Sequence, residues 1–269
     1  MRILAVGDIV GERAVSDLRS RLTEISNKHA PDMVIVNGEN AANIRGLTPE
    51  LARDIFAAGA DVITTGNHIL DRRAILPYLD STDRVLRPAN FPAETPGVGF
   101  CIFPVSGVNV LVINVSGTAL MNQTDITSPF ETAEYILERE SRSGSYDFAV
   151  IDIHAEATGE KLAFARYFDG LRQYRVAAVW GTHTHIPTSD VRILPKGTGY
   201  VTDLGMTGPQ NGVLGVRSDI IISHIKDNVK AKFEVADGPT VLEGVLFDID
   251  PDTARANLVK RVSAGRETF

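Results

Sequence analysis

The chain has 269 residues, of which 43% are hydrophobic and 23% are charged, a composition that is typical of a folded protein and excludes a largely disordered one. Its 27 basic and 34 acidic residues give a net charge of −7, which argues against stable, broad binding to nucleic acids or to anionic membranes. An anionic substrate would therefore need a local positive site, and bound metal ions can supply one.

The sequence carries no feature of an exported or membrane-bound protein. Met1 to Val6 form a strand pattern without the apolar segment of a signal peptide, and no apolar run is long enough to span a membrane. Cys101 is the sole cysteine, so an intrachain disulfide is impossible, which fits a reducing compartment. We therefore expect a cytoplasmic location. A homo-oligomer is compatible with the sequence on general grounds alone.

Short apolar runs and amphipathic segments alternate at the start of the chain. The runs predict strands at Ile3–Val6, Met33–Val36 and Val62–Ile63. A helix is expected over Ala14–Lys28, and a second one begins after Thr48, which can cap it before Pro49, and ends at Gly59. This strand, helix, strand order predicts crossover connections and parallel pairing, and so an α/β fold.

The rest of the chain predicts a second, mixed or antiparallel sheet. Further strands are expected at Phe148–Ile153, Val176–Trp180, Gly97–Val105, Val108–Val115, Ala231–Val235 and Val241–Ile249. The last two flank Asp237-Gly238, which is a hairpin signal. No repeat or linker marks a boundary, so we expect one domain over residues 1–269, with fraying at the polar end, Ser263–Phe269.

Polar residues follow five of the predicted strands directly. They are Gly7-Asp8, Asn37 to Asn40, Gly66-Asn67-His68, His154, and Gly181 to His185. In open α/β sheets ligands bind at the carboxyl ends of the strands. These residues are therefore predicted to share one crevice, although they are far apart in the sequence.

The chemistry of these residues is that of a metal site. The candidate ligands are two carboxylates, two amides and three imidazoles: Asp8, Glu39, Asn40, Asn67, His154, His183 and His185. Oxygen and nitrogen donors without a thiolate suit manganese, iron or zinc. Seven donors exceed what one tetrahedral ion needs, but they suit two ions about 3.5 to 4 Å apart that share a carboxylate. The sequence thus predicts a binuclear centre.

Each candidate also has an ordinary structural explanation when it is taken alone. Asp8 can be a helix cap or turn residue, Asn67 a turn residue, and His154 a core histidine. His183 and His185 form a stronger signal, because alternate residues of an extended segment point the same way. The coincidence of all of them at strand ends favours the metal site.

Two histidines outside these loops serve as a comparison. His29 lies at the end of a predicted helix, and His224 lies in an alternating pattern that predicts a strand. Both are expected to be structural or surface residues, and we leave them out of the site.

The motifs resemble those of the calcineurin-like metallophosphoesterases, whose loops carry Asp, Gly-Asp, Gly-Asn-His, His and Gly-His-x-His in this order. Two departures, Val10 in the first loop and Glu39 at the bridging position, are those of the YmdB-like subfamily. Further segments that resemble this subfamily are residues 37–42, 87–92, 152–158 and 203–209. The chain is identified as a member on these segments.

The resemblance implies a four-layer α/β/β/α sandwich of two mixed sheets flanked by helices. It also implies a phosphodiesterase that acts on 2′,3′- or 3′,5′-cyclic nucleotides through two divalent or trivalent metal ions, iron or manganese above all, and a metal-bridging hydroxide as the nucleophile. One ion would take Asp8, Glu39, Asn40 and His185, and the other Glu39, Asn67, His154 and His183. Asn40 would fill the position that Val10 leaves without a ligand.

His68 resembles the proton donor of the family, which protonates the leaving group. The aspartate that often orients this histidine is replaced by Ala42, so Asn43 and Asp71 are the alternatives for that role. The loops Arg87–Pro92 and Asp203–Pro209 either line the substrate crevice or form ordinary tight turns.

Two other functions stay open at this point. The same two-metal core can hydrolyse phosphomonoesters, so the chain could be a phosphomonoesterase or nucleotidase. A regulatory protein that binds a nucleotide and retains slow hydrolysis is the second alternative.

Overall fold

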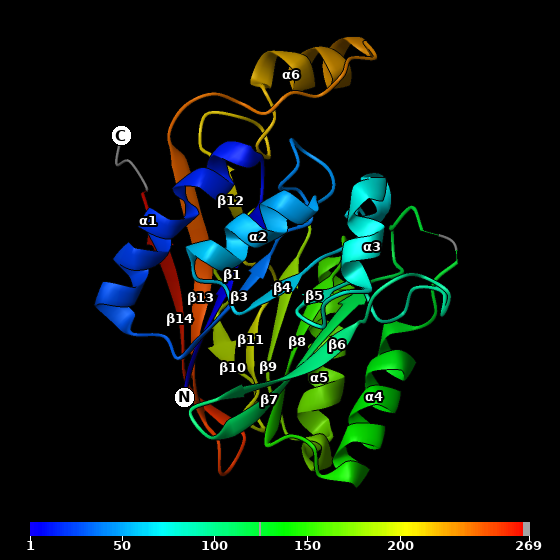
Figure 1. Cartoon of the computed structure of the whole chain (residues 1–269), viewed down its shortest axis with the longest axis vertical. Helices are drawn as coiled ribbons and strands as arrows, with labels where there is room; N and C mark the ends of the chain where they lie inside the picture. Colours follow the sequence, from blue (N-terminus) through cyan, green and yellow to red (C-terminus); the bar gives the residue numbers. More distant parts are fainter. Residues whose placement is uncertain (124, 266–269) are drawn as a thin grey trace.

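Figure 1 shows a computed structural model of the chain, which describes residues 1–123 and 125–265. The helices are α1 (Glu12–His29), α2 (Pro49–Ala58), α3 (Leu76–Leu79), α4 (Pro129–Ser143), α5 (Thr158–Gly170) and α6 (Ser218–Asp227), with short 3-10 helices at Ile69–Asp71, Arg73–Ile75 and Arg172–Tyr174. The strands of the first sheet are β1 (Arg2–Val6), β2 (Asp8–Ile9), β3 (Met33–Asn37), β4 (Val62–Thr64), β5 (Val85–Leu86), β12 (Met206–Pro209), β13 (Thr240–Asp250) and β14 (Arg255–Ala264). The strands of the second sheet are β6 (Phe100–Val105), β7 (Val108–Ser116), β8 (Phe148–His154), β9 (Val176–Thr182), β10 (Arg192–Ile193) and β11 (Gly199–Val201).

Both sheets combine parallel and antiparallel pairing. In the first sheet β1, β3, β4 and β5 run parallel to one another, as the crossover pattern predicts, and β13 pairs with β1 in the antiparallel sense. In the second sheet β7, β8, β9 and β11 are parallel, and the edge strands β6 and β10 are antiparallel. Two mixed sheets were expected, and the structure confirms them.

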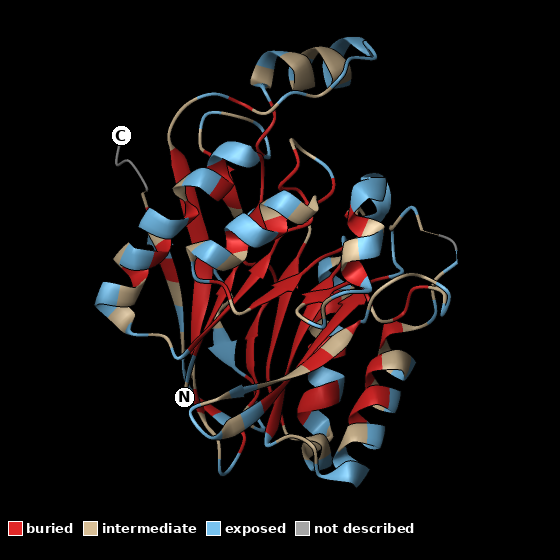
Figure 2. Cartoon of the chain, viewed as in Figure 1, coloured by how far each residue is buried: buried red, intermediate tan, exposed pale blue. Residues whose placement is uncertain are grey.

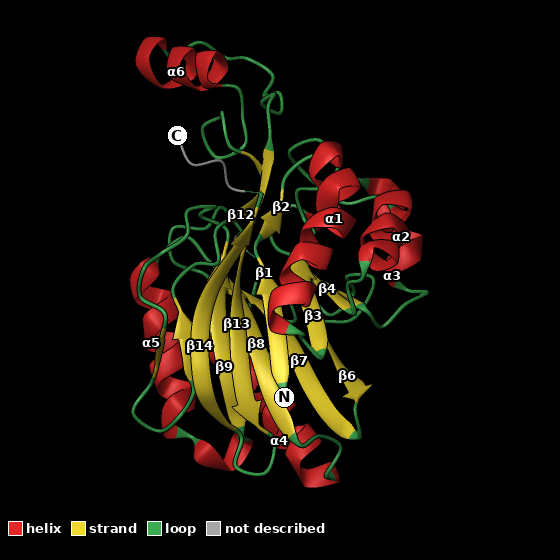
Figure 3. Ribbon diagram, turned by 90° about the vertical axis from the view of Figure 1, so that its left-hand side faces the viewer, coloured by secondary structure: helices red, strands yellow, loops and turns green. Residues whose placement is uncertain are grey.

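The described residues form three apolar cores, and alternate side chains along a strand pack into different ones. Leu4 and Val6 of β1 face α1 and α2, whereas Ile3 and Ala5 face the second sheet. The second sheet repeats this arrangement, with α4 and α5 on its outer face. Figure 3 shows the helices on the two outer sides of the paired sheets, and Figure 2 shows buried residues concentrated in the strands. The fold is therefore the expected α/β/β/α sandwich.

The helix ends follow the local signals in the sequence. The Thr48 hydroxyl accepts a hydrogen bond from the Leu51 N–H (3.3 Å), Pro49 occupies the first turn of α2, and Gly59 ends the helix with a φ of 120°. Such a φ is accessible to glycine at little cost. The loop between β3 and α2, which carries two candidate ligands, is thereby anchored at its far end.

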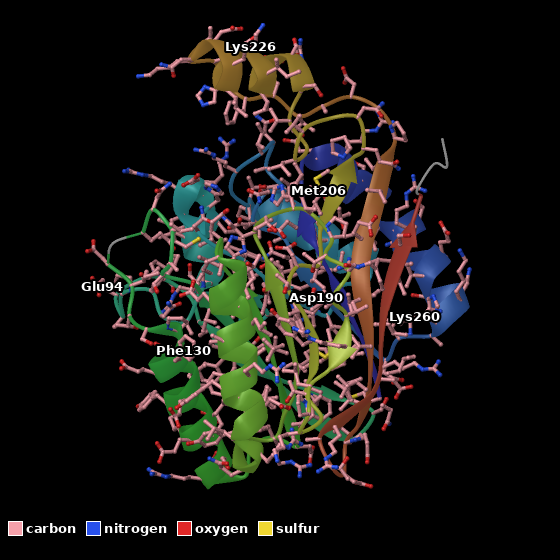
Figure 4. All side chains as sticks on the ribbon, turned by 180° about the vertical axis from the view of Figure 1, so that it is seen from behind. Glu94, Phe130, Asp190, Met206, Lys226 and Lys260 are labelled. Carbon is pink, nitrogen blue, oxygen red and sulfur yellow. The ribbon has the colours of Figure 1, made fainter. Side chains whose placement is uncertain are left out.

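Three expectations about the last third of the chain are wrong. Ala231–Val235 is not a strand, and β13 pairs with β14 rather than forming a hairpin across Asp237-Gly238. His224 lies in helix α6, which has no buried residue, and this helix stands away from the body in Figure 1 and carries Lys226 at the far end of the molecule in Figure 4. Of the segment Ser263–Phe269, where fraying is expected, Ser263 and Ala264 pair in β14, and residues 266–269 lie outside the described residues.

No helix in the described part of the chain is both long enough and apolar enough to cross a membrane.

Candidate metal centre

The carboxyl ends of five strands from both sheets meet at one end of the molecule. Asp8 begins β2 directly after β1, Glu39 follows β3, Asn67 follows β4, His154 ends β8, and His183 follows β9. Parallel strands of the two sheets point toward the same end, so their last residues face one another. The structure brings all seven predicted side chains together, including Asn40 and His185.

The first group of donors surrounds His154. Its Nε2 lies 3.0 Å from Glu39 Oε1, 3.0 Å from Asn67 Oδ1 and 3.0 Å from His183 Nδ1. Among the described residues, candidate ligand atoms of Glu39, His154 and His183 all lie within 4.8 Å of one another. Donor atoms about 3.0 Å apart match the edge of an octahedron with metal–ligand distances of about 2.1 Å. The spacing fits a metal ion.

The second group consists of Asp8, Asn40 and His185. His185 Nε2 lies 3.2 Å from Asn40 Nδ2 and 3.9 Å from Asp8 Oδ1. A backbone bridge between Val10 and Asn40 holds this asparagine beside the first loop. Two buried oxygens, Asp8 Oδ1 and Asn40 Oδ1, have no hydrogen-bond partner. Buried polar atoms normally have a partner, so the unpaired Asp8 oxygen suits a metal ion. Asn40 turns its Nδ2 toward Glu39 and His185, so its Oδ1 would take that place only with the amide group rotated by half a turn.

Each of the three histidines is held through its other ring nitrogen. Thr182 Oγ1 lies 2.9 Å from His154 Nδ1, Glu156 Oε2 lies 3.1 Å from His183 Nε2, and the Leu214 carbonyl lies 3.3 Å from His185 Nδ1. Metal-binding histidines usually have such a partner, which fixes the ring and its tautomer. The second ring nitrogen of each histidine, which these contacts leave available, faces the other candidate ligands.

The turn after β9 brings His183 and His185 together by a different geometry from the one expected. The segment is not extended, because His183 has a φ of 97° and His185 a φ of 63°. Positive φ values are uncommon for residues other than glycine and cluster at functional sites. The two rings therefore converge because the backbone turns, and not because alternate side chains of a strand share a face.

The ionisable groups of the centre perturb one another strongly. Complete burial raises the pKa of Asp8 to about 6. Burial opposes ionisation of Glu39 as well, but the facing His154 and the His68 N–H hold its pKa at about 2. Burial opposes protonation of His154, but Glu39 and Asp8 raise its pKa to about 9. Burial and the nearby His154 lower the pKa of His183 to about 3. The centre thus favours a cation beside its buried carboxylates.

His68 lies beside this centre. Its N–H donates to Glu39 Oε2 (3.0 Å), and its ring Nδ1 lies 2.9 Å from Asp71 Oδ2. The ring also lines an open cleft of about 390 Å³, together with Glu39, Asn40 and His185. Of the two alternatives for orienting His68, the structure favours Asp71, because no hydrogen bond joins Asn43 to this ring among the described residues.

The structure adds supporting residues that the sequence reasoning missed. Asp152 is fully buried and accepts hydrogen bonds from Thr182 Oγ1 (2.8 Å) and Thr64 Oγ1 (2.5 Å), so it supports His154 through Thr182. Asp152 lies two residues before His154 on the same strand, so both side chains point to the same face, and this spacing could have predicted its role. Glu156, which holds His183, lies two residues after the strand end.

A buried ion pair lies beneath the turn after β9. Lys161 Nζ donates to Asp203 Oδ2 (2.8 Å), and both side chains are completely buried. The same carboxylate oxygen accepts from the N–H and the hydroxyl of Thr184, which lies between the two histidines. Removing one partner of a buried pair typically costs about 3 to 5 kcal/mol. No local sequence pattern predicts this pair, because its partners are 42 residues apart.

The two loops that are candidates for the substrate crevice make contacts that support the fold. Neither Arg87–Pro92 nor Asp203–Pro209 contributes to the lining of the cleft as far as the described residues show. Asn90 Nδ2 donates to the carbonyls of Ser116 (2.8 Å) and Thr127 (2.9 Å), and Asp203 supports the turn that carries the histidines.

Gly66 allows His154 to reach the centre. A Cβ atom at this position would lie 2.2 Å from His154 Cδ2, whereas one at Gly159 in α5 would meet nothing within 4 Å. Gly66→Ala is expected to lower the free energy of unfolding by about 1 to 3 kcal/mol, because the ring has no space to move into. Gly159→Ala is the matched control and is expected to leave stability unchanged or slightly raised. Urea denaturation followed by circular dichroism measures both, and an equal midpoint for the two variants would contradict this account of Gly66.

Comparison with known proteins places this chain in a family. A model of the YmdB-like protein family matches residues 4–262. The chain is 43% identical over 262 residues to the 2′,3′-cyclic-nucleotide 2′-phosphodiesterase of Bacillus subtilis (strain 168), covering 97% of this chain and 96% of that protein. It is also 33% identical over 261 residues to a putative phosphatase/phosphodiesterase of Mycoplasma pneumoniae (95% and 90% coverage).

Solved structures agree with these matches. A hypothetical protein from Thermus thermophilus has a TM-score of 0.89 at 34% identity, covering 99% of this chain and 100% of that one. A phosphatase from Mycoplasma pneumoniae has a TM-score of 0.90 at 30% identity, covering 98% of this chain and 93% of that one. A 5′-nucleotidase precursor from Thermus thermophilus, at 14% identity and a TM-score of 0.58, covers 98% of this chain and 54% of that one and shares the fold. On the family match and the identity over nearly its whole length, the chain belongs to the YmdB-like family.

Proposed function

We propose that this protein is a metal-dependent phosphodiesterase that hydrolyses 2′,3′-cyclic nucleotides. The observation that supports the proposal is the convergence of seven residues with oxygen and nitrogen donors from five strand ends, with Asp8 Oδ1 buried and without a hydrogen-bond partner. The name of the Bacillus subtilis relative supports the substrate. Oxygen and imidazole donors favour iron or manganese.

The donors divide into two sets that share Glu39. One ion would be held by Asp8, Glu39, Asn40 and His185, and the other by Glu39, Asn67, His154 and His183. The position of Glu39 between the sets supports this division, because its Oε1 faces His154 and Asn40 at 3.0 and 3.2 Å. When bound, the two ions would activate a water molecule and offset the charge of the phosphate.

The chain's own residues would orient the substrate and supply the proton. Hydrolysis adds water across the bond between phosphorus and O2′, so that the hydroxyl joins phosphorus and O2′ leaves as an alkoxide that needs a proton. Asp71 accepts from Nδ1 of His68, so that Nε2 is the nitrogen that can donate a proton to O2′. The product is a nucleoside 3′-phosphate.

The lining of the cleft supports a substrate that contains a nucleoside. Glu39 and Asn40 lie at its base, and Ile44, Leu214 and Phe233 form apolar walls. An apolar cleft with a few polar groups at one end suits a nucleoside bound through its phosphate. A phosphate ester without a nucleoside would make few contacts with these apolar walls.

We also propose that the reaction takes place in the cytoplasm, since the single cysteine, Cys101, is free and buried.

The substrate assignment is tested by a panel of esters. Manganese- or iron-loaded protein is expected to convert adenosine 2′,3′-cyclic phosphate to adenosine 3′-phosphate, with a kcat/KM at least about tenfold above that for 3′,5′-cyclic AMP or 5′-AMP, because the relative that supports the proposal acts on the 2′ ester. Chromatography of the products gives both rate and regiochemistry. A preference for 5′-AMP would establish a nucleotidase. Binding of cyclic nucleotide with negligible turnover would establish a regulatory protein.

His68→Ala is expected to affect chemistry according to the leaving group. For a cyclic nucleotide, whose leaving group is a poor alkoxide, kcat should fall by about a hundred- to ten-thousand-fold, whereas bis(4-nitrophenyl) phosphate should lose much less. Asp71→Asn should change kcat in the same direction but less, and His29→Ala, at the remote end of α1, serves as the control. Metal content is measured in each variant. Equal losses for both substrates, or a lost metal, would contradict the role of proton donor.

A further inference from the structure

A second cleft opens directly beside the one that exposes the metal centre. Its volume is about 510 Å³, and it shares Ile44, Arg45 and Phe233 with the first cleft. It lies between the loop after β3 and the segment that follows α6, which Figure 1 shows above that loop. The first cleft, at about 390 Å³, is already within the usual range for a small ligand, about 300 to 1,000 Å³. The first cleft therefore has room for a small ligand without the second one.

The second cleft is positively charged in a protein of net charge −7. Its lining includes the cations Arg45, Arg72 and Lys232, and it contains no carboxylate among the described residues. Such a concentration of cations without counter-charges favours an anion. Arginine in particular binds phosphate through paired N–H groups.

The cationic side chains of this cleft differ in whether they already form hydrogen bonds within the protein. Arg72 donates to the carbonyls of Arg45 (3.1 Å) and Ala42 (3.2 Å), so it supports the loop after β3. In contrast, no hydrogen bond or ion pair engages the exposed side chains of Arg45 and Lys232 among the residues that the structure describes. These two side chains are thus available to a ligand.

The boundary between the two clefts combines Arg45 with two apolar side chains. Ile44 and Phe233 line both of them, and Phe233 packs edge-on against His224, with ring centroids 5.5 Å apart. A nucleoside whose cyclic phosphate lies at the metal centre can place its apolar surface against these side chains. A second phosphoryl group on the same nucleoside then has the cationic cleft within reach. On a ribose that carries a 2′,3′-cyclic phosphate, the remaining position for such a group is the 5′ oxygen.

We propose that the second cleft binds a phosphoryl group on the 5′ oxygen of the substrate, so that 5′-phosphorylated 2′,3′-cyclic nucleotides or RNA 3′ ends are better substrates than free cyclic mononucleotides. The proposal rests on the proposed function. It is compatible with the overall negative charge, because a single local phosphate contact requires no extended basic surface.

The test compares three substrates: adenosine 2′,3′-cyclic phosphate, its 5′-phosphorylated form, and a diadenosine dinucleotide that ends in a 2′,3′-cyclic phosphate. The added 5′ phosphate is expected to raise kcat/KM on the order of tenfold, mainly through KM, because it is bound equally in the ground and transition states. A gain for the 5′-phosphorylated mononucleotide identifies a terminal phosphate as sufficient. A gain confined to the dinucleotide identifies an RNA end. Either result supports the subsite.

Charge-removing variants then locate the effect. Lys232→Gln and Arg45→Gln are each expected to lower the ratio of kcat/KM with and without the 5′ phosphate by about threefold to tenfold. Lys230→Gln is the matched control. It removes the same charge as Lys232→Gln, two residues along the chain, from a side chain that does not line the cleft. Arg72 is not substituted, since its contacts support the loop.

The outcomes separate the subsite from the function on which it rests. Turnover of the cyclic mononucleotide without any gain from the 5′ phosphate overturns the subsite and leaves the proposed function intact. If Lys230→Gln and Lys232→Gln lower this kcat/KM ratio equally, the subsite is also overturned. The gain would then reflect general electrostatic attraction of the extra phosphate to the protein. Failure to hydrolyse any of the three substrates overturns both.

Discussion

The structure depends on the burial of two carboxylates close to each other at the junction of the two sheets. Asp8 and Glu39 are completely buried, and no lysine or arginine of the described residues forms an ion pair with either. Charges of one sign are costly in such a position unless an opposite charge compensates them. In the protein alone the compensation comes from His154, whose pKa is raised to about 9. Two bound cations would replace this proton and satisfy the oxygens that have no partner.

The surrounding fold serves to hold this set of donors rigid. The histidine rings are fixed from behind by Thr182, Glu156 and the Leu214 carbonyl, and the turn between two of them is supported by the buried pair Lys161 and Asp203. Rigid donors bind metal without reorganisation, and outer contacts of this kind commonly change metal affinity or activity by about 10- to 100-fold. The positive φ values of His183 and His185 are a local strain that the surrounding packing must offset.

Much of this centre could be predicted from the sequence because strand ends and donor types are local signals. Asp8, Glu39, Asn67 and His154 each stand at the end of a clear apolar run, and the carboxyl ends of parallel strands meet. The contacts between Lys161 and Asp203 could not be predicted, because each residue gains its meaning from a partner far along the chain. Helix α6 was missed for a different reason. Its isoleucines are not buried against the body, so their spacing carries no information about a packed face.

The central claim is that Glu39 joins two metal ions. Anomalous diffraction from crystals grown with manganese tests it most directly, because the ions are located independently of activity. We expect two peaks about 3.5 to 4 Å apart, both in contact with Glu39, one beside Asp8 and His185 and the other beside His154 and His183. A single peak, or none at these side chains in a crystal of active protein, would contradict it.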